Sequence, residues 1–203
     1  MIRARLLIYT KPPRMGLSKT RLADGVGQAE ARRIARFTLS RAMVAARGSG
    51  CETILYLTPD WTLHETLGGL WPPFLPRRPQ GPGTLTERLG KGLKETSPGP
   101  VIFIGTDTPD ISAALIRRAV VMLARFDAVF GPAEDGGFWL FGLNANACTP
   151  SPFHNVRWSG PHAMEDVQRN LPSGFRTGLL PTLADIDERD DWIGWRKAQN
   201  HKS

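Results

Sequence analysis

The sequence predicts an α/β protein built on a mostly parallel β-sheet that helices cover on both faces. Short apolar runs alternate with segments of helical periodicity along the chain. Because a strand reaches a parallel neighbour only through a crossover connection, this alternation favours parallel pairing. The 203 residues, 41% of them hydrophobic, match one ordinary globular domain spanning 1–203.

Each predicted element rests on its own pattern. The strands follow the apolar runs, at residues 5–10, 53–58, 100–105, 128–131 and 138–143. The helices are predicted at 28–47, from about Thr84, after Ser112, and from about Ser159 and Glu188. Asp110 or Ser112 is expected to cap the third of these helices. The segment 72–83, rich in Pro and Gly, is short enough to be a loop.

Charge is distributed unevenly along the chain. The net charge is +7, yet residues 1–50 alone hold 11 Lys and Arg against 2 Asp and Glu. Acidic residues crowd together near the other end, at Asp185, Asp187, Glu188, Asp190 and Asp191. One polyanion site with a metal clamp would use both regions, whereas a solvated basic helix and an acidic loop are the simpler explanation.

Several classes of protein fit the sequence poorly. No apolar run is long enough for a signal-peptide core or a membrane span, and two Cys indicate a reducing compartment, so we expect a cytoplasmic protein. Four scattered His lack zinc-ligand spacing. A nucleic-acid binder is the alternative that a pI near 10.0 favours. Steep salt dependence of DNA binding would identify one.

A basic segment follows the first predicted strand. Lys11, Arg14, Lys19 and Arg21 lie within eleven residues, together with Gly16 and two prolines. Charge-assisted hydrogen bonds to phosphate oxygens are worth roughly 1.5–3 kcal/mol each, so this segment is a candidate phosphate site. An exposed basic turn is the alternative. We expect that replacing Lys19 and Arg21 by Ala weakens ligand binding with little loss of stability.

Acidic residues follow three later segments. Asp107 comes directly after a predicted strand, at the edge of the sheet where ligands bind, and suits a Mg²⁺ ligand, with a structural turn as the alternative. Glu134 and Asp135 precede a pair of glycines and offer carboxylates for sugar hydroxyls or for accepting a proton, although Asp-Gly also signals a hairpin turn. Asp185 and Asp187 alternate around Ile186, so both would face one divalent cation if that segment is extended.

Five segments in order carry a resemblance to a known family: KPPRMGLSKTRL, RPQGPGTLTERL, GTDTPD, GPAEDGGFWLFGL and LADIDERDDW. They resemble the bacterial glycosyltransferases associated with arsenosugar biosynthesis or with radical-SAM and selenodomain proteins. That family belongs to the nucleotide-diphospho-sugar transferase (GT-A) superfamily and is similar to 2-phospho-lactate guanylyltransferase and the molybdenum-cofactor nucleotidyltransferases. The likeness covers about residues 5–192.

The resemblance implies a three-layer α/β/α sandwich with a mixed sheet, and it implies roles for matching residues. Phosphate and nucleotide binding would fall to Lys11, Arg14, Gly16, Lys19, Arg21, Gln80 and Gly81. The metal, Mg²⁺ or Mn²⁺, would be held by Asp107 with Asp187, or less favourably Asp185. Asp135, Gly136 and Gly137 would face the sugar or acceptor, which makes Asp107 and Asp135 the candidate catalytic residues.

The resemblance also implies the reaction class. We expect a metal-dependent transferase that moves a glycosyl group from a nucleotide sugar to a small-molecule acceptor. The alternative is a nucleotidyltransferase that joins a nucleoside triphosphate to a phosphorylated small molecule and releases pyrophosphate. The partners are then small molecules rather than nucleic acid or membrane, and a homodimer is compatible with the sequence.

Overall fold

The computed structural model describes residues 3–96, 98–146 and 148–200. Within them one seven-stranded sheet has the order β3-β2-β1-β4-β6-β5-β7. The strands are β1 (Arg5–Thr10), β2 (Glu52–Leu57), β3 (Arg77–Pro79), β4 (Gly99–Ile104), β5 (Ala128–Pro132), β6 (Phe138–Ala145) and β7 (Thr177–Leu179). Only β6 runs antiparallel to its neighbours in the described residues. The predicted mixed, mostly parallel sheet is confirmed.

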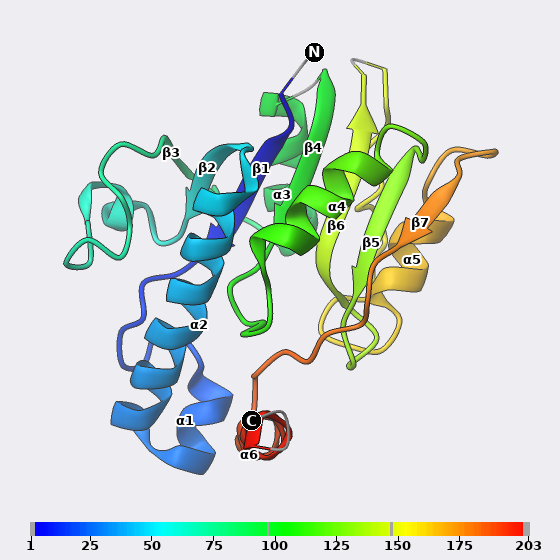
Figure 1. Ribbon diagram of the computed structural model, residues 1–203. Coiled ribbons are helices and arrows are strands. Elements are labelled where there is room, and N and C mark those ends of the chain that lie inside the picture. Colours follow the sequence, from blue (N-terminus) through cyan, green and yellow to red (C-terminus); the bar gives the residue numbers. More distant parts are fainter. Residues whose placement is uncertain (1–2, 97, 147, 201–203) are drawn as a thin grey trace.

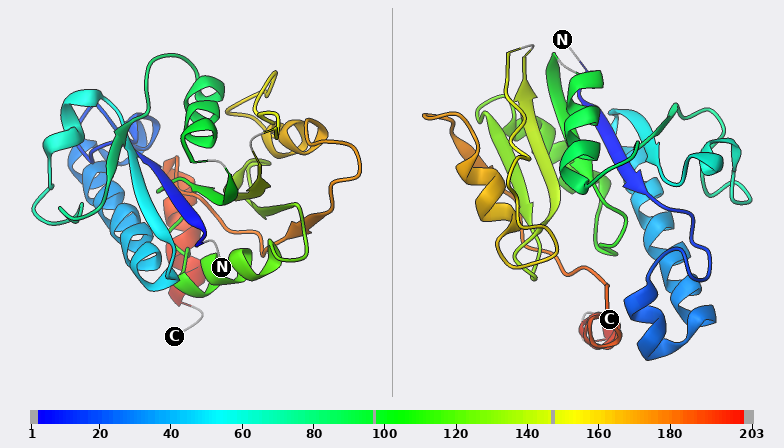
Figure 2. Two further views of the ribbon diagram at one scale, coloured as in Figure 1. Left: turned by 90° about the horizontal axis from the view of Figure 1, so that it is seen from above. Right: turned by 180° about the vertical axis from the view of Figure 1, so that it is seen from behind.

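Helices cover both faces of this sheet, which confirms the three-layer arrangement. They are α1 (Thr20–Val26), α2 (Gln28–Ser49), α3 (Leu85–Thr96), α4 (Ala113–Met122), α5 (Ala163–Arg169) and α6 (Arg189–Asn200), with a 3₁₀ helix η1 (Asp60–His64). Helices α2 and α4 lie on one face, whereas α3 and α5 lie on the other (Figures 1 and 2). Helices α1 and α6 lie beyond the carboxyl ends of the parallel strands.

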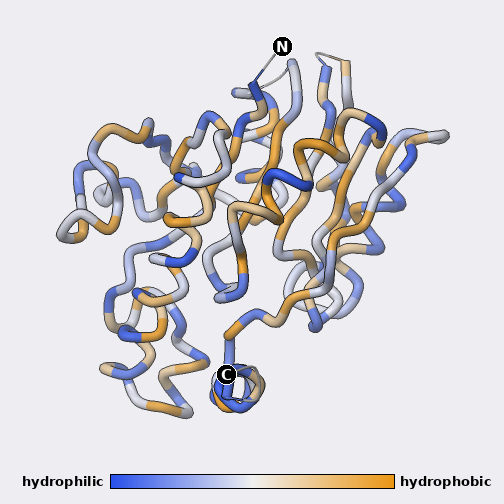
Figure 3. The backbone as a smooth tube through the Cα atoms, viewed as in Figure 1, coloured by the Kyte–Doolittle hydropathy of each residue, from blue (hydrophilic) through white to orange (hydrophobic). Residues whose placement is uncertain are grey.

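The core is divided between the two faces because successive side chains of a strand point in opposite directions. In β1, Leu6 and Ile8 pack with residues of α2 and α4, whereas Leu7 packs with Leu89 and Leu93 of α3. Figure 3 shows hydrophobic residues along the strands and a largely hydrophilic α6. In the described residues no helix combines the length and apolarity that crossing a membrane requires.

The predicted elements are present, and the structure decides or changes several details. Ser112 caps α4 by accepting a hydrogen bond from the Leu115 N–H, and Asp110 does not. The helix expected from Ser159 begins at Ala163. The short edge strands β3 and β7 and helix α1 were not predicted. Segment 72–83 contains β3, whose residues Arg77–Pro79 lack an apolar pattern and, among the described strands, pair with β2 alone.

The segment after β7 runs along the edge of the sheet and contacts the residues that follow β5 and β4. Leu183 forms a bridge with Ala133 at the end of β5, and the Ile186 N–H donates to the Asp107 carbonyl oxygen at 3.0 Å. Ile186 is fully buried and packs with Leu22 of α1 and Trp192 of α6. This segment therefore brings the acidic residues 185 and 187 next to the loops that follow β1 and β4.

Candidate functional site

The basic opening segment and the distant aspartates meet at Lys19. Its ammonium group contacts the Asp107 carboxylate and the Ile186 carbonyl oxygen, and it lies 3.0 Å from Asp187 Oδ1. Arg21 lies 2.8 Å from the other Asp187 oxygen. The proximity that the sequence predicts is therefore present, because β1 and β4 are parallel neighbours whose carboxyl ends meet at one edge.

Lys19 lies directly before α1 and its side chain is buried. It precedes α1 with φ 54° and ψ 43°, a left-handed conformation that is uncommon for a residue with a Cβ atom. Its side chain is 5% exposed. Burial by itself lowers the pKa of Lys19, but the Asp107 and Asp187 carboxylates raise it above its usual range. Lys19 is thus a buried, charged group held by two carboxylates.

A pocket of about 500 Å³ surrounds this cluster and is basic on one side. We call it the basic pocket. Four of the predicted phosphate-site residues line it: Lys11, Lys19, Arg21 and Gln80. Thr10, Leu85 and Arg88 are also part of the wall. The cations and the aspartates therefore share one cavity, as one site for a metal-bound polyphosphate would require.

Three predicted phosphate-site residues do not line the basic pocket. The Arg14 guanidinium pairs with Glu65 and lies 4.8 Å from the centre of the Trp61 ring. Gly16 is exposed, and Gly81 packs against the Lys91 side chain. Their phosphate role stays a prediction, and for Arg14 it requires the guanidinium to leave its present partners.

Arg88 is a wall residue that the sequence did not single out. Its guanidinium donates to the Gln80 side-chain oxygen at 3.4 Å, while the Gln80 amide donates to the carbonyl oxygens of Thr10 and Tyr56. Arg88 Nε is buried and has no hydrogen-bond partner among the described residues. One signal could have found Arg88: it lies in the RPQGPGTLTERL segment, close to one helical turn after Leu85.

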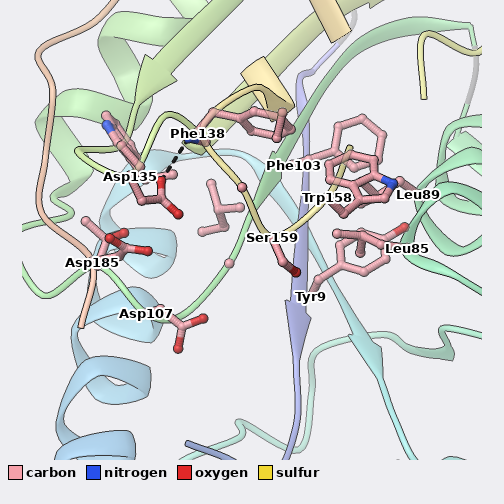
Figure 4. Close-up of a pocket in the computed structure, with 18 residues that line it drawn as sticks. Tyr9, Leu85, Leu89, Phe103, Asp107, Asp135, Phe138, Trp158, Ser159 and Asp185 are labelled. Atoms are coloured by element: carbon pink, nitrogen blue, oxygen red, sulfur yellow. Dashed lines mark hydrogen bonds between the residues drawn. The ribbon is translucent and has the colours of Figure 1, made fainter. Parts of the chain in front are cut away.

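The loop between β5 and β6 is a hairpin turn that also lines a cavity. The Asp135 Oδ1 atom accepts a hydrogen bond from the Gly137 N–H at 2.8 Å (Figure 4). Gly136 has φ +85°, and a Cβ atom there would lie 2.3 Å from the Pro161 carbonyl oxygen. Close backbone contact therefore accounts for Gly136 without a ligand, whereas Asp135 also lines the cavity, and in the described part of the chain no hydrogen bond is seen to its Oδ2 atom.

Asp185 lies among other carboxylates. Burial first, and then the charges of Asp135 and Asp187, raise the pKa of Asp185 to about 6. In the described residues no three His, Cys, Asp or Glu side chains are grouped closely enough to hold a metal by themselves. Asp107 and Asp187 nevertheless share one cation, the Lys19 ammonium, and their oxygens suit Mg²⁺ or Mn²⁺, which complete their coordination with water and phosphate oxygens.

A second cavity of about 230 Å³ adjoins the basic pocket, and the two share Tyr9, Leu85, Gly105 and Asp107. We call it the aromatic chamber, because Phe103, Phe138 and Trp158 line one side of it. Figure 4 shows these rings on one side and Asp107, Asp135 and Asp185 on the other. None of the aromatic residues was predicted as part of a site.

The chamber loop, residues 157–160, is anchored by Asp166 of α5. The Arg157 N–H and Nε donate to Asp166 Oδ2 at 3.0 and 2.8 Å, and a second guanidinium nitrogen donates to Oδ1. The Asp166 side chain is 5% exposed. These hydrogen bonds hold the pKa of Asp166 well below its usual range.

Asp166→Asn is expected to lower stability in a pH-dependent way. Because the carboxyl pKa is depressed in the folded state, its contribution is complete above the unfolded-state pKa of about 3.9 and is lost as pH falls below it. Urea unfolding of both proteins should show a gap at pH 7 that narrows toward pH 3. Glu165→Gln, on the same helix but 61% exposed, is the control and should show little change. A gap that is constant with pH would contradict this role.

Comparison with known proteins places the chain in a family. Residues 41–160, more than half of the chain, match the family described as "Uncharacterized protein conserved in bacteria (DUF2064)". The chain belongs to this family. No curated protein matches the DUF2064 chain.

Solved structures are similar to this DUF2064 protein over nearly its full length. A "putative nucleotide-diphospho-sugar transferase" from Desulfovibrio desulfuricans G20 is 27% identical, with a TM-score of 0.84 and coverage of 98% of this chain and 89% of that one. CMP:2-keto-3-deoxy-manno-octonic acid synthetase complexed with CTP is 12% identical, with a TM-score of 0.60 and complete coverage of both chains. Rv0371c from Mycobacterium tuberculosis H37Rv, in complex with manganese, is 14% identical, with a TM-score of 0.55 and coverage of 95% and 97%. The chain thus has the nucleotide-diphospho-sugar transferase fold.

Proposed function

We propose that this DUF2064 protein is a nucleotide-dependent transferase that binds an activated nucleotide donor in the basic pocket. One observation carries the proposal: Lys19, Asp107 and Asp187 meet in the wall of a cavity that Lys11, Arg21 and Arg88 also line. The likeness to a D. desulfuricans protein described as a nucleotide-diphospho-sugar transferase supports it. The further resemblance to arsenosugar-associated glycosyltransferases supports glycosyl transfer in particular.

Asp107 and Asp187 would hold a divalent cation, with Mn²⁺ favoured by the manganese complex of Rv0371c and Mg²⁺ by the oxygen donors. When bound, the cation draws negative charge from the donor diphosphate. Lys19 would bind phosphate oxygens in place of its carboxylate partners, and Arg21 and Lys11 would bind the same group. These residues stabilise the charge that develops on the leaving diphosphate.

In glycosyl transfer, the acceptor oxygen bonds to the anomeric carbon while the bond from that carbon to the diphosphate oxygen breaks. Asp135 is placed to accept the acceptor proton on Oδ2, since Oδ1 already accepts from the Gly137 N–H. Asp135 and Asp107 line the aromatic chamber together, so the acceptor would approach from that side. Gly137 allows its backbone to come close to the sugar, and Gly136 holds the turn.

Nucleotidyl transfer is the second candidate, and the number of cations favours it. Lys11, Lys19, Arg21 and Arg88 line the basic pocket, which suits the charge of a triphosphate whose pyrophosphate leaves. The two reactions use the same residues and differ in the bond that breaks. Release of a nucleoside diphosphate identifies glycosyl transfer, whereas release of pyrophosphate identifies nucleotidyl transfer.

A panel of nucleotide sugars and nucleoside triphosphates, with and without Mn²⁺ or Mg²⁺, tests the proposal. We expect at least one nucleotide at a concentration of about 100 Kd to raise the free energy of unfolding by about 2.7 kcal/mol in a metal-dependent way. Differential scanning fluorimetry measures the corresponding rise in Tm. Arg88→Gln should reduce that rise and leave the Tm without ligand nearly unchanged. No shift with any nucleotide and either metal would overturn the proposal.

A further inference from the structure

The aromatic chamber lies beside the basic pocket and opens toward the same aspartates. We infer that it binds the non-nucleotide substrate of the reaction, and that this substrate has a compact apolar body with its reacting group directed at Asp107 and Asp135. The inference rests on the proposed function, because the reaction defines which substrate is left to bind. The inference adds the chemical class of that substrate, which neither the family nor the similar structures indicate.

The polar atoms of the chamber's Tyr and Trp side chains are occupied elsewhere. The Tyr9 hydroxyl donates to the Arg88 carbonyl oxygen at 2.9 Å, and Trp158 Nε1 donates to Thr86 Oγ1 at 2.9 Å. Trp139 Nε1 donates to the Pro181 carbonyl oxygen at 3.1 Å. These residues therefore present their ring surfaces to the chamber and keep their hydrogen-bonding groups outside it.

The other residues on the side of the rings are apolar as well. Leu85, Leu89, Phe103 and Phe138 line it, and the Phe138 and Trp158 rings lie edge to face with centres 6.2 Å apart. A sugar hydroxyl placed there would lose its water partners without gaining new ones, which costs about 1–3 kcal/mol for each group. An alkyl or aromatic body would instead gain about 25 cal/mol for each Å² of apolar surface removed from water.

The polar groups lie at the opposite end of the chamber, so a bound molecule would have one orientation. Asp107, Asp135 and Asp185 are grouped on that side, and Ser159 lies between them and the rings (Figure 4). Ser159 has φ 62°, a conformation rare for a residue with a Cβ atom and often retained at ligand sites. A hydroxyl on an apolar body would therefore point toward Asp135.

The chamber volume limits the size of this body. A cavity of about 150 Å³ lined by apolar side chains can hold benzene. The chamber measures about 230 Å³, which accommodates one ring with a short substituent. The inferred substrate is thus a small hydroxylated molecule with a single apolar ring or a comparable alkyl group.

Benzyl alcohol is the probe that tests this inference, with D-xylose as a fully polar probe of similar size. Saturation-transfer NMR on the full chain should detect saturable binding of benzyl alcohol and much weaker binding of D-xylose. Two variants locate the probe. Trp158→Ala removes a wall of the chamber, and Gly160→Leu adds a side chain to its lining at a position where an added Cβ atom meets no atom within 4 Å. Each should weaken benzyl alcohol binding by about tenfold.

Phe74→Ala is the matched control, since Phe74 is 76% exposed and lines neither the chamber nor the basic pocket. It should leave benzyl alcohol binding unchanged. If Trp158→Ala fails to fold, Gly160→Leu decides the test. Absence of saturable binding, equal binding of D-xylose, or binding that neither chamber variant changes would overturn the inference.

A nucleotide thermal shift on the same samples separates this inference from the proposed function. Nucleotide binding without benzyl alcohol binding overturns the inference alone. Benzyl alcohol binding without any nucleotide binding overturns the proposed function and, with it, the role given to the chamber.

Discussion

Asp107→Asn should lower turnover by about 10²-fold or more, equivalent to at least about 2.7 kcal/mol of transition-state stabilisation, while the fold is retained. Asp107 lies at the junction of the basic pocket and the aromatic chamber, and its carboxylate is half exposed and pairs with Lys19. An amide of the same shape keeps the loop contact, because the Ile186 N–H donates to the Asp107 backbone oxygen rather than to its side chain. The variant therefore removes charge and little structure.

Two measurements check this expectation. Turnover is measured as the release of nucleoside diphosphate or of pyrophosphate, with the donor found in the nucleotide panel. The metal-dependent part of the nucleotide thermal shift is recorded in parallel. Asp24→Asn is the control, since Asp24 is an exposed acid of α1 that lines neither cavity. A folded Asp107→Asn protein with normal turnover would remove Asp107 from the mechanism.

Lys19→Ala should weaken donor binding by about tenfold or more and also lower stability. The loss of binding follows from removing a charge-assisted hydrogen bond to phosphate, worth roughly 1.5–3 kcal/mol. The loss of stability follows from burial: the Lys19 side chain is 5% exposed, and its removal leaves Asp107 and Asp187 facing each other without their shared cation. Because both carboxylates remain partly exposed, we expect about 1–2 kcal/mol.

Metal should reverse the stability change selectively. Mn²⁺ or Mg²⁺ is expected to raise the Tm of Lys19→Ala more than that of the unaltered protein, since the ion replaces the missing ammonium group between the two carboxylates. Arg21→Ala is the matched control: its side chain is 62% exposed, so donor binding should weaken while stability changes by no more than about 0.5 kcal/mol. Equal metal shifts in all three proteins would argue against a shared cation position.

Burial corrects one expectation from the sequence. Replacing Lys19 and Arg21 together was expected to weaken binding with little loss of stability, which assumed that both cations are exposed. Of these two side chains only Arg21 is exposed, at 62%, whereas the Lys19 side chain is 5% exposed. The double variant should therefore lose the stability that Lys19 provides, and Arg21→Ala is the substitution that tests phosphate binding cleanly.

The sequence by itself determined the sheet and the edge at which the polar residues gather. Apolar runs and helical periodicity are local patterns, so the five longer strands and the long helix at 28–49 could be predicted to within a few residues. Parallel strands place their carboxyl ends together, and for this reason Asp107 was expected near the basic segment. Local patterns fail at β3 and α1, where pairing with β2 and packing of Leu22 against Ile34 stabilise the element.

Only the tertiary structure decided which side chains share a cavity and what they contact there. Lys19 and Asp187 are 168 residues apart, and neither residue's neighbours in the sequence indicate that they pair. The same holds for Arg14, whose guanidinium contacts Glu65 and Trp61 and does not line the basic pocket. It also holds for the rings of the aromatic chamber, which come from four separate segments of the chain. Side-chain direction and burial depend on packing between distant segments, so the spacing of residues along the chain does not predict them.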